Sequence, residues 1–338
     1  MRYSTVCAVK GFIKLGVLFA ITALILIVSF GNNQASYENV TIAPTTPSPE
    51  QELHTYIKEL GSWEVRNRSV VNPHPHSYIN APSATCKLNG AKEDPFLLIL
   101  VKSYVSNLGH REAIRATWGK ILPSYVKLIF ILGHIDFMKL YVDIESKQYK
   151  DIVQEDFLDV YRNNTVKTIM GFNWVVNNCQ NSTYIYFVDD DYLVNVPKII
   201  KYLRTYTKAK NGKDLYAGYR WEKAYPKRSN VSKWFVSVDD YPCRIWPPYV
   251  GGGSVVMSMD VASKMKDAFP YIKPIFIDDV YLGIVAAALG IQAKMLGRFS
   301  PDYRPNMIDK LYSTHGVGSS STMLNDWQKI KHKVKLNF

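Results

Sequence analysis

Cysteine is scarce in this sequence, with four residues in 338, and no two of them form a CxxC pair. Structural zinc sites need cysteine and histidine ligands at short, regular spacing, so this scarcity argues against a zinc centre. Cys86, Cys179 and Cys243 allow one disulfide in an oxidising compartment, and the sequence leaves its pairing open. A chain of this length with so few cysteines depends on a hydrophobic core rather than on a cystine framework.

Two phosphate-binding signatures are also missing. No GxGxxG follows the first predicted strand, and GxxxxGK[ST] does not occur. Both motifs use backbone N–H groups to hold phosphates, so their absence disfavours a dinucleotide-dependent dehydrogenase and a P-loop enzyme. No internal repeat is present either.

Acidic residues are outnumbered by basic ones, 29 to 41, which gives a net charge of +12. Four lysines near the C-terminus, Lys329, Lys331, Lys333 and Lys335, would suit nucleic acid. Nucleic acid is nevertheless disfavoured as a partner, because the hydrophobic run at residues 15–31 predicts that the chain after it is lumenal. A nucleotide diphosphate, an anionic glycan or an acidic membrane surface fits the positive field better.

One long uncharged run is present, Leu15 to Gly31, preceded by Arg2, Lys10 and Lys14. Its length is at the short end of what crosses a bilayer, and its basic flank predicts that residues 1–14 stay cytosolic. We therefore expect a single-pass type II anchor at residues 15–31, with the rest of the chain lumenal. A cleaved signal peptide is the alternative, disfavoured because the site near Asn33-Gln34-Ala35 is a poor one.

Asn-X-Ser/Thr sequons support the lumenal assignment independently, because such asparagines are glycosylated in the secretory pathway. Five of them lie after the predicted anchor: Asn39, Asn67, Asn163, Asn181 and Asn230.

Residues 32–93 are rich in Pro, Ser, Thr and Asn, and we expect them to form a stem with little packed structure. Within it, Glu50 to Leu60 has the pattern of a short helix. His74 and His76 are flanked by prolines, which favours a solvated linker over a metal site. Residues 94–338 have the length of one large domain or of two tightly joined halves.

Apolar runs alternate with helical patterns through this domain. Strands are predicted at 96–101, 126–132, 150–157 and 184–188, with helices at 111–118, 135 onward and 165–177. Strands that are apolar throughout, with helices between them, indicate a mostly parallel central sheet covered on both faces.

Three consecutive carboxylates, Asp189, Asp190 and Asp191, follow the last of these strands. Such acids repel one another unless a cation neutralises them. Oxygen ligands at a strand's carboxyl end suit Mn²⁺ or Mg²⁺ bound to a diphosphate, because open α/β sheets bind nucleotides there. A solvated acidic turn or an isolated helix cap is the alternative.

Three other segments carry candidate functional residues. Arg111 and Arg115 share one helical face after the first strand, where they would bind phosphate or a base, unless they simply line a surface helix. Trp246-Pro247-Pro248-Tyr249 precedes Gly251, Gly252 and Gly253, which together suit sugar binding or a tight bend. Asp278 and Asp279 begin a helix, as caps or as a general base.

The order of these motifs resembles the β1,3-galactosyltransferase and β1,3-N-acetylglucosaminyltransferase family, which is related to the fringe glycosyltransferases. The matching segments are IRxTWG at 114–119, a D-F-x-D-x-Y-like segment at 156–168, F-x-W with a later Cys at 172–179, the aspartate triplet, PPYxxGG at 247–253 and Asp-Val-Tyr-x-Gly at 279–283. Together they cover about residues 96–327.

This resemblance implies a Golgi enzyme with a GT-A fold, which transfers a sugar from a UDP-sugar donor to a 3-hydroxyl of a glycan acceptor with inversion. Asp191, helped by Asp189, would hold Mn²⁺, with His315 as a further ligand. Asp279 would be the general base, tuned by Asp278, which replaces the usual Glu. The remaining roles fall to Arg111, Arg115 and Asp190 at the nucleotide, and to Trp246, Tyr249, Gly251, Gly252 and Gly253 at the donor and acceptor sugars.

Three departures from the family pattern stand out. Phe187 occupies the place of a Lys before the triplet, and Val250 and Val285 replace two cysteines. Loss of both cysteines is what loss of one disulfide would look like, and packing would have to replace about 2–4 kcal/mol.

The sequence therefore predicts a β1,3-hexosyltransferase, with galactose as the first choice of donor sugar and N-acetylglucosamine or N-acetylgalactosamine next. An inactive lumenal glycan-binding protein of the same fold is one rival, and a structural membrane protein or chaperone is another. A glycoside hydrolase fits less well, because it needs two opposed carboxylates but no metal or nucleotide site. The acceptor and the oligomeric state are left open.

Overall fold

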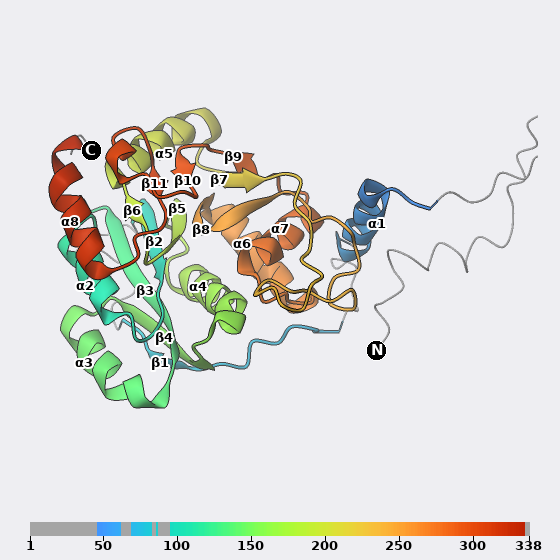
Figure 1. Cartoon of the computed structure of the whole chain (residues 1–338), viewed down its shortest axis with the longest axis horizontal. Coiled ribbons are helices and arrows are strands. Elements are labelled where there is room, and N and C mark those ends of the chain that lie inside the picture. Colours follow the sequence, from blue (N-terminus) through green and yellow to red (C-terminus); the bar gives the residue numbers. More distant parts are fainter. Residues whose placement is uncertain (1–45, 62–68, 83–85, 87–94, 335–338) are drawn as a thin grey trace, which may run out of the picture.

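The structure, a computed structural model, describes residues 46–61, 69–82, 86 and 95–334. An eight-stranded sheet lies at its centre in the order β1-β4-β3-β2-β5-β8-β7-β9, with helices on both faces (Figure 1). Its strands are β1 (Tyr78–Asn80), β2 (Leu97–Lys102), β3 (Val126–His134), β4 (Ile152–Leu158), β5 (Tyr184–Asp189), β7 (Tyr216–Trp221), β8 (Tyr249–Ser258) and β9 (Lys294–Met295). A smaller sheet contains β6 (Leu193–Val194), β10 (Phe299–Ser300) and β11 (Ser313–Thr314).

The central sheet is mixed. Strands β4, β3, β2 and β5 run parallel to one another, whereas β8 is antiparallel to both β5 and β7. The prediction of a mostly parallel sheet therefore holds for β4, β3, β2 and β5 and for the β7–β9 pair, and it is wrong where β1 meets β4 and where β8 meets β5 and β7. Parallel neighbours need a helical crossover, but the 222–248 loop returns β7 directly to β8, and a direct return allows antiparallel pairing.

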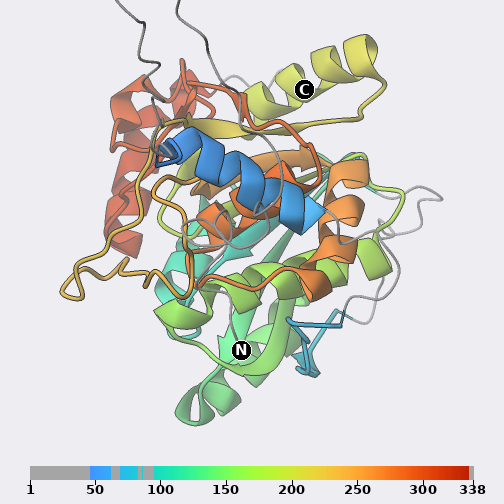
Figure 2. The same ribbon diagram turned by 90° about the vertical axis from the view of Figure 1, so that its right-hand side faces the viewer.

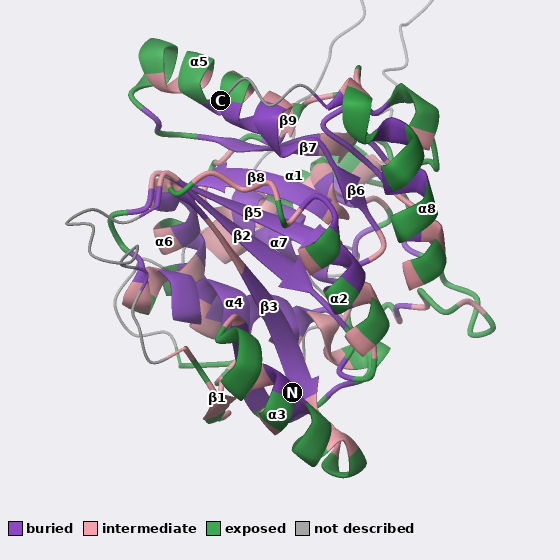
Figure 3. Cartoon of the chain, turned by 90° about the vertical axis from the view of Figure 1, so that its left-hand side faces the viewer, coloured by how far each residue is buried: buried purple, intermediate pink, exposed green. Residues whose placement is uncertain are grey.

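Helices cover both faces because successive side chains of a strand point to opposite sides. On β2, Leu98 and Leu100 pack with side chains of α4, α6 and α7, while Ile99 and Val101 pack with those of α2, α5 and α8. Figure 3 shows buried strands enclosed by helices whose outer surfaces are exposed. The helices are α1 (Pro49–Gly61), α2 (Leu108–Ala116), α3 (Lys139–Tyr149), α4 (Asn164–Asn178), α5 (Val196–Lys210), α6 (Met259–Ala268), α7 (Asp278–Ala288) and α8 (Ser320–Ile330).

The region expected to be an unpacked stem contains two packed pieces. Helix α1 lies across the body of the molecule (Figure 2) and packs against α7, and Tyr56 makes an edge contact with Tyr241 at a 5.3 Å ring separation. Residues 69–80, which we call the strap, follow. The backbone N–H groups of Val71 and Asn72 donate to the carbonyl of Pro270, and β1 extends the sheet beside β4.

The strap histidines also differ from expectation. His74 Nε2 lies 2.6 Å from a carboxylate oxygen of Glu155, and His76 Nδ1 lies 3.2 Å from Asp156. They bind β4 instead of lying in a solvated linker. The short helix considered over Glu50 to Leu60 is confirmed as α1, but the prediction of little packed structure is wrong, because α1 and the strap both pack on the domain.

A disulfide joins Cys86 to Cys179, at the end of α4, with 5.2 Å between their Cα atoms. The predicted cytosolic tail, the anchor at 15–31 and the sequons Asn39 and Asn67 lie outside the described residues. Within the described part of the chain, no helix is long and apolar enough to cross a membrane.

Candidate active site

Lys102 links the two acidic motifs. It ends β2 directly opposite Asp189 at the end of β5, because the two strands pair in parallel register. Its ammonium group lies 2.9 Å from Asp189 Oδ1 and 2.8 Å from Asp278 Oδ2. Burial acts to lower the pKa of Lys102, but the two carboxylates outweigh it and the pKa is raised, so the side chain stays charged.

Asp278 is a buried, fully bonded carboxylate. Its Oδ2 accepts hydrogen bonds from Lys102 and from Thr168 Oγ1, the latter at 2.9 Å. Burial acts to raise its pKa, yet the Lys102 ammonium and these hydrogen bonds hold the pKa below its usual value. Asp278 is therefore an anion held in place by the protein rather than a free base.

Asp279 is the carboxylate of this pair that can gain or lose a proton near neutral pH. It starts α7, where Oδ2 accepts a hydrogen bond from the N–H of Gly252 at 3.0 Å and Oδ1 accepts one from Val280 at 2.8 Å. Burial and the negative charge of Asp278 raise its pKa to about 7. A carboxylate with this pKa can accept a proton near neutral pH, as a general base must.

The glycines of β8 make room for this arrangement. A Cβ on Gly252 would lie 3.0 Å from Asp279 Cβ, and one on Gly253 would lie 2.4 Å from the hydroxyl of Tyr192. A Cβ on Gly251 would lie 3.1 Å from Trp221 Nε1. These glycines lie within an extended strand without positive φ, so the alternative of a tight bend is wrong. Their close neighbours are protein side chains.

Asp191, two residues after Asp189, has one carboxylate oxygen in a hydrogen bond and one without a partner. His315 Nε2 is 3.0 Å from Asp191 Oδ2, and this hydrogen bond raises the pKa of His315. Tyr192 packs on the His315 ring at 4.9 Å. The other oxygen, Asp191 Oδ1, is shielded from solvent and has no hydrogen-bond partner.

This donor set fits a divalent cation that also binds phosphate. Burial raises the pKa of Asp189 to about 6, against the attraction of Lys102, as expected for a carboxylate that lacks sufficient neutralising charge. Within the described residues, no group of three His, Cys, Asp or Glu side chains is arranged to hold a metal. Mg²⁺-type sites use one or two carboxylates and take their remaining ligands from substrate phosphates and water.

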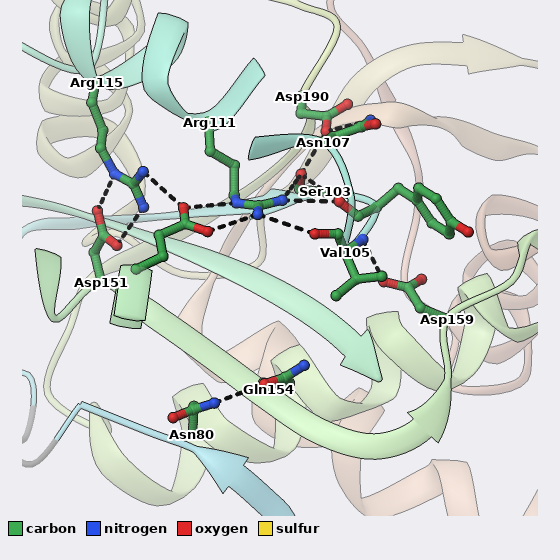
Figure 4. A network of polar contacts seen from close by, with 12 residues as sticks. Asn80, Ser103, Val105, Asn107, Arg111, Arg115, Asp151, Gln154, Asp159 and Asp190 are labelled. Carbon is green, nitrogen blue, oxygen red and sulfur yellow. Dashed lines mark hydrogen bonds and ion pairs between the residues drawn. The ribbon is translucent and has the colours of Figure 1, made fainter. Parts of the chain in front are cut away.

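Asp190 faces away from this pair. Its Oδ2 accepts hydrogen bonds from Ser103 Oγ at 2.6 Å and from Asn107 Nδ2 at 3.0 Å, both in the loop between β2 and α2 (Figure 4). Asp190 therefore fixes that loop beside the acids.

The prediction that Arg111 binds a nucleotide is wrong. Its guanidinium is fully buried and forks onto Glu145 at 2.9 and 2.7 Å, and it donates to the carbonyls of Tyr104 and Val105 (Figure 4). Arg111 thus fixes the position of the β2–α2 loop from inside the protein.

Arg115 also forms ion pairs within the protein. It pairs with Glu145 and Asp151 at 2.8 Å each, and it lies over the rings of Phe130 and Tyr149. Both arginines are ion-paired within the fold.

Trp246 is not an exposed sugar platform. It is buried and stacks on Tyr241 at a 4.1 Å ring separation, so its predicted role at the sugars is wrong. Tyr249 is half-buried, and its Cβ would lie 2.4 Å from a Cβ on Gly283, which fixes β8 against α7.

The departures from the family pattern are absorbed by packing. Val250 and Val285 are buried in one apolar cluster, and Phe187 stacks on Phe172 at 4.9 Å. Lys102 supplies a positive charge at the triplet from the neighbouring strand.

The described sequons differ in accessibility. Asn181 and Asn230 are exposed, whereas Asn163 is half-buried and its side chain donates to the carbonyl of Leu158.

Sequence reasoning missed Lys102 and Thr168. One signal for Lys102 was available, a lone charge at the end of an otherwise apolar run that leads into the crevice. Thr168 ends the family-like segment at 156–168, but nothing in that segment points to its partner Asp278, which is 110 residues away.

Comparison with known proteins identifies the family of the chain. A family model described as "Galactosyltransferase" matches residues 109–296. The chain is 33% identical to the β1,3-galactosyltransferase brn of Drosophila melanogaster over 75% of this chain and 80% of that one. It is 35% identical to a rat UDP-GalNAc:β1,3-N-acetylgalactosaminyltransferase (71% and 76% covered).

A zebrafish lactosylceramide 1,3-N-acetyl-β-D-glucosaminyltransferase is 33% identical, over 78% of this chain and 74% of its own. Among solved structures, the bifunctional glycosyltransferase WbbM aligns with a TM-score of 0.41 at 9% identity, covering 74% of this chain and 53% of that one. On the family model and these sequence relatives, the chain belongs to the galactosyltransferase family and is a glycosyltransferase.

Proposed function

We propose that the protein is an inverting β1,3-hexosyltransferase that moves galactose, or else N-acetylglucosamine or N-acetylgalactosamine, from a UDP-sugar to a 3-hydroxyl of a glycan acceptor. The observation that carries this proposal is Asp279, a carboxylate with a pKa of about 7 beside a second, ionised carboxylate that Lys102 ties to the aspartate triplet. The names of the relatives supply the linkage and the three candidate sugars.

Asp279 would remove the proton from the acceptor hydroxyl while the oxygen of that hydroxyl bonds to the anomeric carbon of the donor sugar. The bond from that carbon to the UDP oxygen breaks, and UDP departs with the electron pair. The N–H groups of Gly252 and Val280 orient the carboxylate, and Lys102 and Thr168 keep Asp278 ionised and in position. This fixed geometry needs no rearrangement during proton transfer.

Asp191 would bind Mn²⁺, or Mg²⁺, through its unpartnered Oδ1, with Asp189 and His315 as the neighbouring candidate ligands and the diphosphate supplying the rest. When bound, the metal would neutralise charge on the leaving diphosphate. We place the enzyme in the Golgi membrane as a type II protein anchored by residues 15–31, because of the hydrophobic run, its basic flank and the sequons.

The test uses the full chain with a panel of UDP-sugars and glycan acceptors, and measures released UDP with and without Mn²⁺. We expect one sugar to be turned over in a metal-dependent way, and Asp279→Asn to lower turnover by at least ~100-fold while UDP binding stays near normal. Undiminished turnover by Asp279→Asn would place the base elsewhere. A folded wild-type protein that binds no UDP would refute the transferase assignment.

A further inference from the structure

Two exposed aromatic side chains stand beside the carboxylates without a role in the chemistry above. Tyr161, in a 3-10 turn before α4, is 52% exposed, and Trp234, in the 222–248 loop, is 43% exposed. The indole Nε1–H donates to the Tyr161 hydroxyl at 2.9 Å. We call these two residues, together with Lys233, the aromatic platform.

The platform is held in one arrangement. The Lys233 ammonium lies 4.6 Å from the centre of the Trp234 ring and 5.7 Å from that of Tyr161. Phe276 meets Tyr161 edge-on at 6.3 Å, while Arg162 lies over Phe276 at 4.8 Å.

The loop that carries Trp234 is held as well. The Arg228 guanidinium donates to four backbone carbonyls at 2.7–2.9 Å, those of Val236, Ser237, Tyr241 and Cys243. Four hydrogen bonds from one charged donor, three of them partly buried, tie this loop together. A preformed surface loses little conformational entropy when a ligand binds, so these exposed rings are suited to recognition.

The platform borders the proposed base. Phe276 precedes Asp278 by two residues along the chain, and Thr165, four residues after Tyr161, donates to the carbonyl of Ile275 at 2.6 Å. Burial raises the pKa of Tyr161, and the charges of Asp278, Asp279 and Asp189 raise it further, so its phenol lies within electrostatic reach of all three carboxylates. A molecule bound on the platform would therefore lie close to Asp279 and could bring a hydroxyl group to it.

We propose that Tyr161 and Trp234, with Lys233 behind the indole, form the subsite for the acceptor sugar, a pyranose that stacks its C–H face on the indole and offers hydroxyl groups to the Tyr161 phenol. Tyr and Trp combine a large apolar face with a polar tip, which matches the two-sided character of a sugar ring. Because the Lys233 ammonium already lies over one face of the indole, the sugar takes the opposite face. This subsite rests on the proposed function, because it assigns the acceptor side of that reaction.

The experiment compares wild-type full-length protein with Trp234→Ala, Trp234→Phe and a matched control, Tyr141→Ala, whose ring is 60% exposed on α3. The probes are the methyl β-glycosides of galactose, N-acetylglucosamine and N-acetylgalactosamine. Released UDP gives KM and kcat for donor and acceptor, and saturation-transfer NMR detects glycoside binding without turnover. Far-UV circular dichroism verifies folding.

In Trp234→Ala we expect the KM for the accepted glycoside to rise about tenfold, as loss of an aromatic contact predicts, with the KM for the UDP-sugar and the rate of UDP-sugar hydrolysis unchanged. Trp234→Phe should keep most of the affinity, and Tyr141→Ala should match wild type. An unchanged acceptor KM in folded Trp234→Ala, or an equal rise in the donor KM, would overturn the subsite.

The NMR arm separates this proposal from the proposed function. Saturation transfer to a glycoside that Trp234→Ala loses would support the subsite even if no UDP-sugar were turned over, and only the transferase reaction would then be refuted. Wild-type protein that transfers saturation to none of the three glycosides would overturn the subsite for these sugars.

Discussion

Replacing Lys102 by Met should destabilise the protein substantially, because it removes the cation between two carboxylates and leaves their charges in place. Methionine has a similar length and packs in the same space, so the change isolates the charge. The Lys102 side chain is 4% exposed and its partner Asp278 is 10% exposed, while Asp189, at 36%, can be hydrated.

The magnitude follows from those exposures. Breaking a buried ion pair by removing one partner destabilises a protein by about 3–5 kcal/mol. Because only Asp278 is left deeply buried, we expect the lower end, about 3 kcal/mol at pH 7. For a domain of this size that corresponds to a fall in Tm of roughly 6–12 °C.

The penalty should depend on pH. Without Lys102, the folded-state pKa of Asp278 is expected to lie above its unfolded value, so the loss of stability should be largest at neutral pH and should shrink as pH falls and Asp278 becomes protonated. Urea unfolding at pH 7 and pH 5 would measure this, with the double variant Lys102→Met/Asp278→Asn as control. That variant removes both charges and should recover stability. A single variant as stable as wild type at pH 7 would refute the reasoning.

The pH–rate profile should show turnover rising through about pH 7, because Asp279 must be deprotonated to accept a proton, and Asp278→Asn should move this limb to lower pH by removing the neighbouring charge. Asp191→Asn should abolish Mn²⁺-dependent UDP binding in calorimetric titrations while the Tm changes little; unchanged UDP affinity would remove the metal assignment. Arg111→Lys should cost about 2–4 kcal/mol in urea unfolding, because lysine cannot reproduce the fork on Glu145, and the folded protein should keep its UDP affinity. Deleting residues 1–82 should lower the Tm well below that of a chain lacking only residues 1–45, since α1 and the strap pack on the domain; equal Tm values would contradict their stabilising role.

The central strands could be predicted from sequence because burial on both faces requires continuous apolar residues. The runs predicted at 96–101, 126–132 and 184–188 became β2, β3 and β5 nearly at those bounds. The sequence also put Asp189 correctly at the carboxyl end of a parallel strand, because that property depends on order along the chain and not on side-chain direction.

The arginines show what a local pattern lacks. Spacing of four residues places Arg111 and Arg115 on one side of α2, but it does not say which side faces the core. Their partners Glu145 and Asp151 lie more than 30 residues away, and only the packing of α3 beside α2 brings them near. The prediction for Trp246 is wrong for the same reason, because an aromatic residue beside two prolines can lie either in the core or on the surface.

Composition misled the interpretation of the strap. Proline and asparagine lower the prospect of a regular element, but they do not prevent a segment from bonding to a preformed surface. Asn72 donates to the carbonyl of Phe269 and to the hydroxyl of Tyr281, both about 200 residues away. No property of residues 69–80 alone identifies those acceptors.

With the anchor that we propose at residues 15–31, the docked α1 helix would limit how far the catalytic domain can lie from the membrane. The tether would be the segment 32–48 and not the whole of 32–93, because the chain joins the domain at α1. Whatever its conformation, a segment of that length spans at most about 60 Å. So short a tether would keep the active site at a high effective concentration relative to glycans attached close to the same membrane, and it would exclude acceptors that extend farther into the lumen.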